Sequence, residues 1–264
     1  MTDERKRVIY AVQAGIAILE LSEPPANCYS HEMMRDLDEA ILRARFDETV
    51  HVIVLRGAGE KFFCAGADIG MLQRVTPLYK YNFCLHANET LNRLEQTPKL
   101  VIAALNGHCV GGGLEVAMAA DVRLACRGDG KIGLPEVNLG VLPGTGGTQR
   151  LARLVGKARA LEMMALGRTC SFDEALEMGL VNHIYDKDVF WDQVLAYARQ
   201  FVPPARASKA VGLIKRAVQT GLEVGFEQGL ALERELQQQL FQSEDAAEGL
   251  RAYNEKRKPE FKGR

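Results

Sequence analysis

Two glutamates in this chain stand among apolar neighbours, a setting in which carboxylates are rare. Glu115 closes the glycine run of "NGHCVGGGLEVAMAADVRLA" (106–125), and Glu136 lies in "KIGLPEVNLGVLPGTGGTQRL" (131–151). Removal from water raises the pKa of a carboxyl group and suits it to proton transfer near neutral pH. A single glutamate is usually solvated, but two in such settings predict a catalytic acid/base pair of Glu115 and Glu136.

The three glycines at 111–113 allow three interpretations: a phosphate cradle, a packing device or part of an active site. A P-loop would need GxxxxGK[ST], whereas Leu114 and Glu115 follow here, and a carboxylate would repel a phosphate. A glycine-rich helix start suits a carbonyl group better, because its free N–H groups point at whatever binds there. We therefore predict that the Gly112 N–H stabilises a developing oxyanion, with tight helix packing as the alternative.

A second segment, "EKFFCAGADIGML" (60–72), also places small residues before a helix. Asp68 is a candidate N-cap, and the small residues before it would let a backbone N–H face a ligand. A hole with two donors, the N–H groups of Ala67 and Gly112, is the simplest use of both segments. Taken alone, this segment is equally compatible with an ordinary loop that leads into a helix.

The elements that must position these groups alternate between strands and helices. Two short strands are predicted around a turn at Gly15, and buried β-branched runs predict strands within 50–59 and 99–107. "VRLAC" and "GKIGL" indicate shorter strands, and helical spacing after a candidate Ser30 N-cap predicts a helix within 30–47. This alternation predicts an α/β protein.

From "WDQVLAYARQFV" onward the pattern becomes purely helical, and "VPPAR" (202–206) marks a joint in that region. We therefore expect two domains, an α/β core with the active site at 1–195 and a helical region at 196–264. Ser243 is a suitable N-cap for the last helix.

Composition restricts the class of protein. The 264 residues carry 33 basic and 34 acidic side chains, so no overall positive field would attract nucleic acid. No apolar run approaches the ~20 residues that span a bilayer, and the charged start "MTDERKRVIY" lacks the apolar stretch of a secretory signal. The cysteines and histidines form no CxxC pair or metal-spaced cluster. We therefore expect a soluble cytoplasmic protein with no metal site, no membrane span and no nucleic-acid partner.

Together with "FFCAGADI" and the tail "SEDAAEGLRAYNEKRKPEFKG", the two glycine–glutamate segments resemble the crotonase (enoyl-CoA hydratase/isomerase) superfamily, nearly from end to end. The resemblance implies an α/β spiral of repeated ββα units and a helical C-terminal region that builds homo-trimers, often paired into hexamers. It also implies an acyl-CoA thioester substrate and no cofactor, since coenzyme A is part of the substrate. The family's oxyanion-hole donors fall on Ala67 and Gly112, and its hydratase glutamates on Glu115 and Glu136. Further coenzyme A contacts are implied at Ala65, Asp68, Ile69, Gly70, Gly144, Phe261 and Lys262.

Glutamate at both positions favours a hydratase, because relatives that only isomerise double bonds commonly lack the first glutamate. The expected reaction is reversible syn addition of water across the 2,3 double bond of a fatty or branched 2-enoyl-CoA, with Glu115 as base and Glu136 as proton donor. A double-bond isomerase, and a hydratase for branched or cyclic acyl groups such as methylglutaconyl-CoA, are alternatives. An RNA-binding relative ranks low because acids match bases in "MMRDLDEAILRARFDE", and the intact glutamates argue against an idle scaffold.

Two positions depart from the family pattern. Asn27-Cys28-Tyr29 replaces the common Asn-Ala-Leu, and Gly70 stands where relatives often carry a lysine. Both departures concern the binding of coenzyme A and leave the predicted chemistry unchanged. The motifs do not define the acyl chain length, because the expected pocket wall is the poorly patterned "GMLQRVTPLYKYNF" (70–83).

Overall fold

Six strands form the larger of two sheets in the computed structural model, which describes residues 5–264. The first four residues of the charged start lie outside this range. β1 (Val8–Gln13) and β2 (Ile16–Leu21) form the predicted hairpin, whose turn residues Ala14 and Gly15 both have positive φ. The remaining strands follow in parallel, in the order β1-β2-β3-β5-β7-β10: β3 (Val52–Gly57), β5 (Leu100–Leu105), β7 (Val122–Cys126) and β10 (His183–Tyr185).

A second sheet has the strand order β4-β6-β8-β9. Its strands are β4 (Phe62–Cys64), β6 (His108–Val110), β8 (Lys131–Gly133) and β9 (Thr169–Ser171). β8 was predicted from "GKIGL", whereas β4, β6 and β9 were not; strands of three residues are too short to display a reliable period of two. β4, β6 and β8 each follow a strand of the larger sheet and precede helical structure, which is the repeated ββα unit of the expected spiral. The α/β fold class is confirmed.

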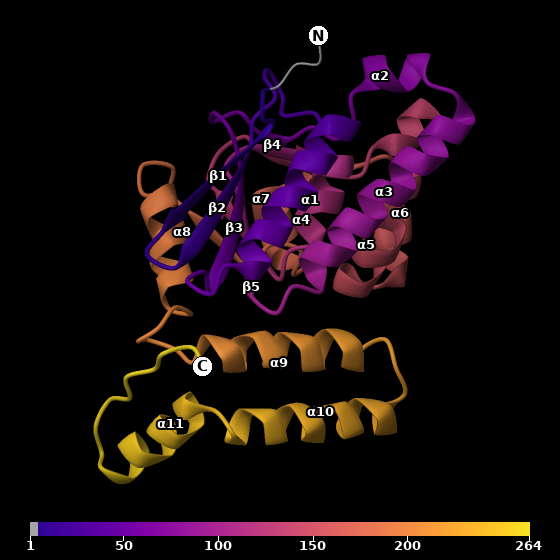
Figure 1. Ribbon diagram of the computed structural model, residues 1–264. Coiled ribbons are helices and arrows are strands. Elements are labelled where there is room, and N and C mark those ends of the chain that lie inside the picture. Colours follow the sequence, from indigo (N-terminus) through magenta and orange to yellow (C-terminus); the bar gives the residue numbers. More distant parts are fainter. Residues whose placement is uncertain (1–4) are drawn as a thin grey trace.

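Helices cover both faces of the larger sheet, as its continuously apolar strands require (Figure 1). α8 (Phe190–Arg199) packs its buried side chains on one face, and α1, α3 and α4 pack on the other. The predicted N-caps are confirmed: Ser30, Asp68 and Ser243 accept hydrogen bonds from the first turns of α1 (His31–Phe46), α2 (Ile69–Arg74) and α11 (Glu244–Asn254). The core helices besides α8 are α1 (His31–Phe46), α2 (Ile69–Arg74), α3 (Pro77–Glu95), α4 (Gly112–Met118), the 3-10 turn η1 (Glu136–Leu139), α5 (Gly147–Val155), α6 (Lys157–Ala165) and α7 (Phe172–Glu177).

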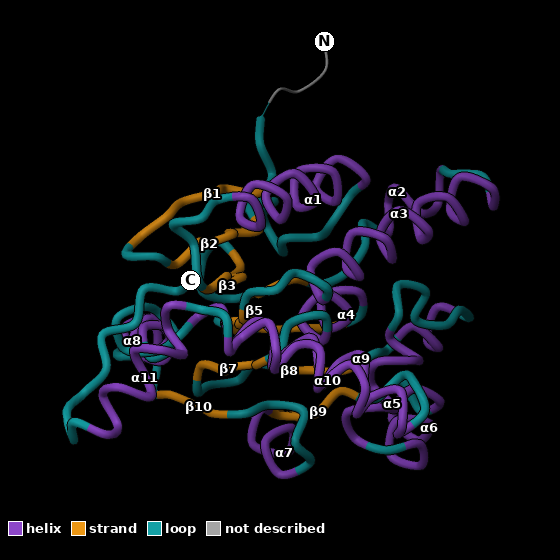
Figure 2. The backbone as a smooth tube through the Cα atoms, turned by 60° about the horizontal axis from the view of Figure 1, so that its bottom comes forward, coloured by secondary structure: helices purple, strands orange, loops and turns teal. Residues whose placement is uncertain are grey.

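Three further helices form a layer against one end of the core: α9 (Ser208–Gly221), α10 (Phe226–Phe241) and α11 (Glu244–Asn254) (Figures 1 and 2). Residue 195, the expected domain boundary, lies within α8, and the chain leaves the core after that helix. The division into two domains at this point stays a prediction. No helix within the described range is long and apolar enough to cross a membrane.

α9 is attached to the core by close packing and a buried ion pair. The Lys215 ammonium lies 2.8 Å from Asp121 Oδ2 and donates to the Lys99 carbonyl oxygen, 3.1 Å away. Gln219 Nε2 donates to the other oxygen of Asp121 at 3.0 Å. A buried ion pair with hydrogen bonds on both partners resists removal of either one. These contacts fix the position of α9, and with it the helical layer, on the core.

Replacing Gly212 by alanine should weaken the packing of α9 on the core and lower the free energy of unfolding. A Cβ atom on Gly212 would overlap the carbonyl oxygen of Pro98, so the backbones must separate. Overpacking of this kind costs about 1–3 kcal/mol. Gly221 on the same helix has no atom within 4 Å of an added Cβ, and Gly221→Ala is therefore the matched control, expected to be neutral or slightly stabilising. Urea unfolding at one protein concentration checks this, and equal midpoints for the two variants would show that the contact with Pro98 is not tight.

Candidate active site

The three glycines at 111–113 are each required by a different neighbour. Gly111 has a φ of +56°, and a Cβ atom there would lie 3.2 Å from Glu136 Oε1. A Cβ atom on Gly112 would overlap the hydroxyl group of Tyr29, and one on the third glycine would overlap a carbonyl oxygen of β4. Tight packing, the alternative interpretation of the run, therefore operates here. The same packing brings the start of α4 against Tyr29 and Glu136.

The two predicted donors, the N–H groups of Ala67 and Gly112, lie on adjoining segments. Gly66 has a φ of +90°, and a Cβ atom there would lie 2.9 Å from the nitrogen of Gly112. Tyr29 pairs with both neighbours of Ala67: its N–H donates to the Gly66 carbonyl oxygen (2.9 Å), and its own carbonyl accepts from the N–H of residue 68 (3.3 Å). Within residues 5–264, neither donor has a hydrogen-bond acceptor. Both N–H groups are therefore available to a bound carbonyl oxygen.

Glu115 is held on α4 with its carboxylate anchored by a loop. The side chain is buried, at 2% exposure, and Oε1 accepts hydrogen bonds from the backbone N–H groups of Thr145 and Gly147, both at 2.7 Å. Burial raises the pKa of this carboxyl group, and the two N–H donors oppose that rise because they stabilise the charged form. Oε1 is thus occupied by the protein, which leaves Oε2 for other partners.

Glu136 stands at the start of η1 with a different environment. Its Oε2 is buried and has no hydrogen-bond partner among the described residues. Burial raises the pKa of this carboxyl group to about 7, and the negative charge of nearby Glu115 adds to the rise. The two glutamates are therefore brought together but differ in environment: Glu115 accepts two backbone N–H groups that favour its charged form, whereas Glu136 titrates at about pH 7 and holds its proton below that pH.

The loop that anchors Glu115 was only partly anticipated from the sequence. Asn88 on α3 donates from Nδ2 to the Gly144 carbonyl oxygen at 3.3 Å and fixes the start of this loop. The Thr145 hydroxyl lies 3.2 Å from the hydroxyl of Tyr29, which packs beneath the start of α4. The glycines of "PGTGGTQR" indicated a close backbone approach, but nothing in the sequence indicated that this loop would bind the carboxylate of Glu115.

The residues expected to line coenzyme A on the first segment lie together at the start of α2. Asp68 Oδ1 accepts from the Met71 N–H at 3.0 Å, so this carboxylate is used as a cap. Ile69 follows it and is 52% exposed, and Gly70 comes next on the same turn. The Ala65 N–H is taken by a backbone carbonyl oxygen, and Gly144 borders Cys84 on α3. Coenzyme A contacts at these positions stay predictions.

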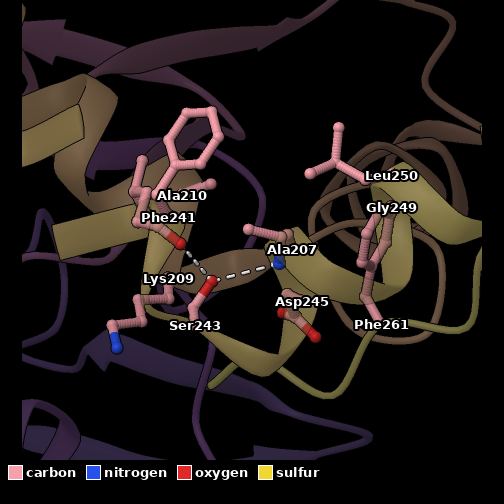
Figure 3. Close-up of a pocket in the computed structure, with 11 residues that line it drawn as sticks. Ala207, Lys209, Ala210, Phe241, Ser243, Asp245, Gly249, Leu250 and Phe261 are labelled. Carbon is pink, nitrogen blue, oxygen red and sulfur yellow. Dashed lines mark hydrogen bonds between the residues drawn. The ribbon is translucent and has the colours of Figure 1, made fainter. Parts of the chain in front are cut away.

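Phe261 and Lys262 are not brought to this site within one chain. Phe261 lies beside Gly249, and both line an apolar pocket of ≈ 330 Å³ between α9, the end of α10 and α11 (Figure 3). The Lys262 N–H donates to Asp245 Oδ1 at 2.6 Å, which ties the tail to the start of α11. A role for either residue toward coenzyme A would therefore require a neighbouring subunit.

Metal-dependent chemistry has no visible ligand set here. Residues 5–264 contain no group of three or more histidine, cysteine, aspartate or glutamate side chains arranged to hold a metal ion. The chemical groups of the site are two carboxyl groups with unequal proton affinity and two free backbone donors.

The spiral of ββα units, with a pair of free N–H groups beside one buried and one half-buried glutamate, defines a crotonase-fold protein. The chain belongs to the enoyl-CoA hydratase/isomerase family, whose model matches residues 11–264. It is 36% identical over 263 residues to a short-chain-enoyl-CoA hydratase of Clostridium acetobutylicum, which covers 99% of this chain and 100% of that protein. It is 33% identical to the mitochondrial methylglutaconyl-CoA hydratase of Rattus norvegicus, with 98% and 83% covered. A crystal structure of an enoyl-CoA hydratase from Geobacillus kaustophilus HTA426 superposes with a TM-score of 0.95 at 45% identity, covering 99% and 98% of the two chains.

Proposed function

We propose that this protein is an enoyl-CoA hydratase, which adds water reversibly and on one face across the 2,3 double bond of a 2-enoyl-CoA thioester. The observation that carries the proposal is an unequal pair of glutamates: buried Glu115 accepts two backbone N–H groups, and half-buried Glu136 has a pKa raised to about 7. A carboxylate with two donors and a carboxyl group that titrates near pH 7 suit a base and an acid that work near neutral pH. Full-length similarity to hydratases supports the same reaction.

The two carboxyl groups divide the reaction between them. Glu115 accepts a proton from water while the water oxygen bonds to Cβ, and the electron pair of the double bond moves toward the thioester oxygen. Glu136 then donates its proton to Cα as that electron pair returns, which completes the addition of one H and one OH. After the addition the pair still holds one proton, which is now on Glu115 instead of Glu136. Because the two carboxyl groups share one proton, they titrate as a coupled pair.

The N–H groups of Ala67 and Gly112 stabilise the negative charge that develops on the thioester oxygen. Donors held by the backbone need no reorganisation during the reaction, and one such donor contributes about 3 kcal/mol to a transition state. Every step is carried by these backbone and carboxyl groups, and the proposal includes no cofactor.

Assembly and location complete the proposal. Several large apolar side chains on the helical layer are exposed in the single chain, among them Ile214, Val218, Leu222 and Phe226. Such a surface supports association, and we propose that residues 196–264 form the trimerisation region on a core of residues 1–195. Phe261 and Lys262 would then contact coenzyme A bound to a neighbouring subunit.

The similar bacterial hydratases support a cytoplasmic location for this protein.

The direct test is hydration of crotonyl-CoA, followed as loss of the absorbance of the conjugated enoyl thioester. In D₂O, hydration should place one deuterium at Cα. Migration of the double bond without hydration would instead show an isomerase. Absence of any reaction across straight, branched and cyclic enoyl-CoAs would contradict the proposed function.

The pH dependence of kcat/KM should show the proton on Glu136. Because burial raises the pKa of this group to about 7, it is protonated below that pH and increasingly ionised above it. Hydration needs the protonated form, so kcat/KM should fall above about pH 7, approaching tenfold per pH unit. The dehydration direction must show the same fall, since the overall reaction releases no proton. A profile that stays flat to pH 9 would contradict this role of Glu136.

A further inference from the structure

Lys80 places a positive charge on the face of α3 that borders the proposed site. Residues spaced three and four apart share a helix face, so Lys80 lies on one side with Phe83, Cys84 and Ala87. Phe83 and Ala87 are buried, and Cys84 borders Gly144 in the loop that anchors the first glutamate. This face of α3 is therefore a wall of the site.

The Lys80 ammonium has no ion-pair partner or hydrogen-bond acceptor in the part of the chain that the structure describes. It lies over the Phe83 ring, 5.3 Å from the centroid, and the side chain is half-buried. Phe83 in turn lies 5.8 Å, centroid to centroid, from Tyr29 beside the start of α4. The contacts thus run from the ammonium through two aromatic rings to Gly112.

The charge of Lys80 acts on both proposed catalytic groups. Burial is the main influence on the pKa values of Glu115 and Glu136 and raises both, while the positive charge of Lys80 lowers both. A charge that reaches both carboxyl groups lies on their side of α3. A pocket for a purely hydrocarbon chain gains nothing from an unpaired ammonium, because burying it costs hydration energy.

We propose that Lys80 binds an anionic group at the far end of the acyl chain, so that the preferred substrates are short 2-enoyl-CoA thioesters with a terminal carboxylate. This inference rests on the proposed hydratase function. The negative charge of the glutamate pair near the reacting carbons would repel a carboxylate on the substrate, and the ammonium offsets that repulsion. Phe83 and Tyr29 provide apolar surface for the carbons between the double bond and the carboxylate.

Two other roles of Lys80 predict different effects when its ammonium group is removed. If the ammonium contacts the phosphates of coenzyme A, its removal weakens every acyl-CoA equally. If the ammonium only lowers the pKa values of the two glutamates, its removal shifts the pH profile equally for every substrate. Only a contact with the acyl chain makes the effect depend on the acyl end group.

The test compares glutaconyl-CoA with 2-pentenoyl-CoA, which differ by a carboxylate in place of a methyl group at the chain end. We expect the wild-type enzyme to favour glutaconyl-CoA in kcat/KM. Lys80→Met should lower kcat/KM for glutaconyl-CoA about 10- to 100-fold, the loss expected for a hydrogen bond between charged groups. It should change kcat/KM for 2-pentenoyl-CoA less than about threefold, and Lys80→Arg should retain the preference.

Lys157→Met, on the exposed start of α6, is the matched control and should leave both substrates unchanged. Equal losses for both substrates in Lys80→Met, or a wild-type preference for 2-pentenoyl-CoA, would overturn the inference and leave the hydratase function standing. Absence of hydration of either substrate by the wild-type enzyme would contradict the hydratase function and this inference with it.

Discussion

Glutamine in place of Glu115 is expected to lower kcat for hydration of crotonyl-CoA by about 10²- to 10⁴-fold, the usual contribution of a positioned acid or base. The amide cannot accept the proton of the attacking water. Its oxygen can still accept the N–H groups of Thr145 and Gly147, which now bond Oε1, so the loop should keep its position. The loss therefore reports chemistry rather than folding, and an unchanged urea midpoint is the check on that point.

Glu136→Gln is the companion variant and should lose activity by a similar factor. Because the amide does not titrate, the residual activity should also lose the fall in kcat/KM above about pH 7. The double variant should be scarcely slower than either single one, since groups that act as a unit are not additive. Undiminished hydration by Glu115→Gln would show that the two-glutamate mechanism is wrong.

Alanine in place of Gly112 should lower kcat/KM about 10²- to 10³-fold, the loss associated with one oxyanion donor. The added Cβ overlaps the Tyr29 hydroxyl, so either the tyrosine or the start of α4 must move. The N–H that faces the carbonyl oxygen moves with the helix start. Hydration kinetics measure the loss, and binding of a saturated acyl-CoA shows whether the ground-state complex survives.

A second substitution separates the two possible origins of that loss. Tyr29→Leu removes the atoms that the new Cβ meets, so activity should return in part in the Gly112→Ala, Tyr29→Leu double variant. Tyr29→Leu alone serves as the background. If the double variant is no faster than Gly112→Ala, the overlap with Tyr29 is not the cause of the loss.

The candidate site could be predicted where a short stretch of sequence carries its own chemistry. A glutamate three residues after Gly112 and another after Pro135 stand out as carboxylates in apolar surroundings, and the glycine run excludes a phosphate loop by its lack of a lysine. The N-cap at Asp68 is likewise a local feature, since a cap involves only residues within one turn. Such features are visible because cause and effect lie within a few residues.

The second sheet and the position of α8 in the core were less visible for the opposite reason. β4, β6 and β9 have three residues each, and their pairing depends on strands far along the chain. α8 reads as one more amphipathic helix, yet its buried face covers the larger sheet while α9 turns away to a separate layer. Neighbouring helices with similar patterns thus have different partners, which no periodicity distinguishes.

The sequence by itself determined which residues could do chemistry: two glutamates in apolar settings, two small-residue turns that free an N–H, and no cluster of metal ligands. Tertiary structure alone decided how they differ and what holds them. It gave Glu115 two backbone donors from residues 145 and 147 and left Glu136 Oε2 without one, and from this their unequal proton affinity arises. It also brought Lys80 to the same site. The physical reason is that a pKa depends on burial and on charges and donors in space, and these come from parts of the chain about 20 to 60 residues apart.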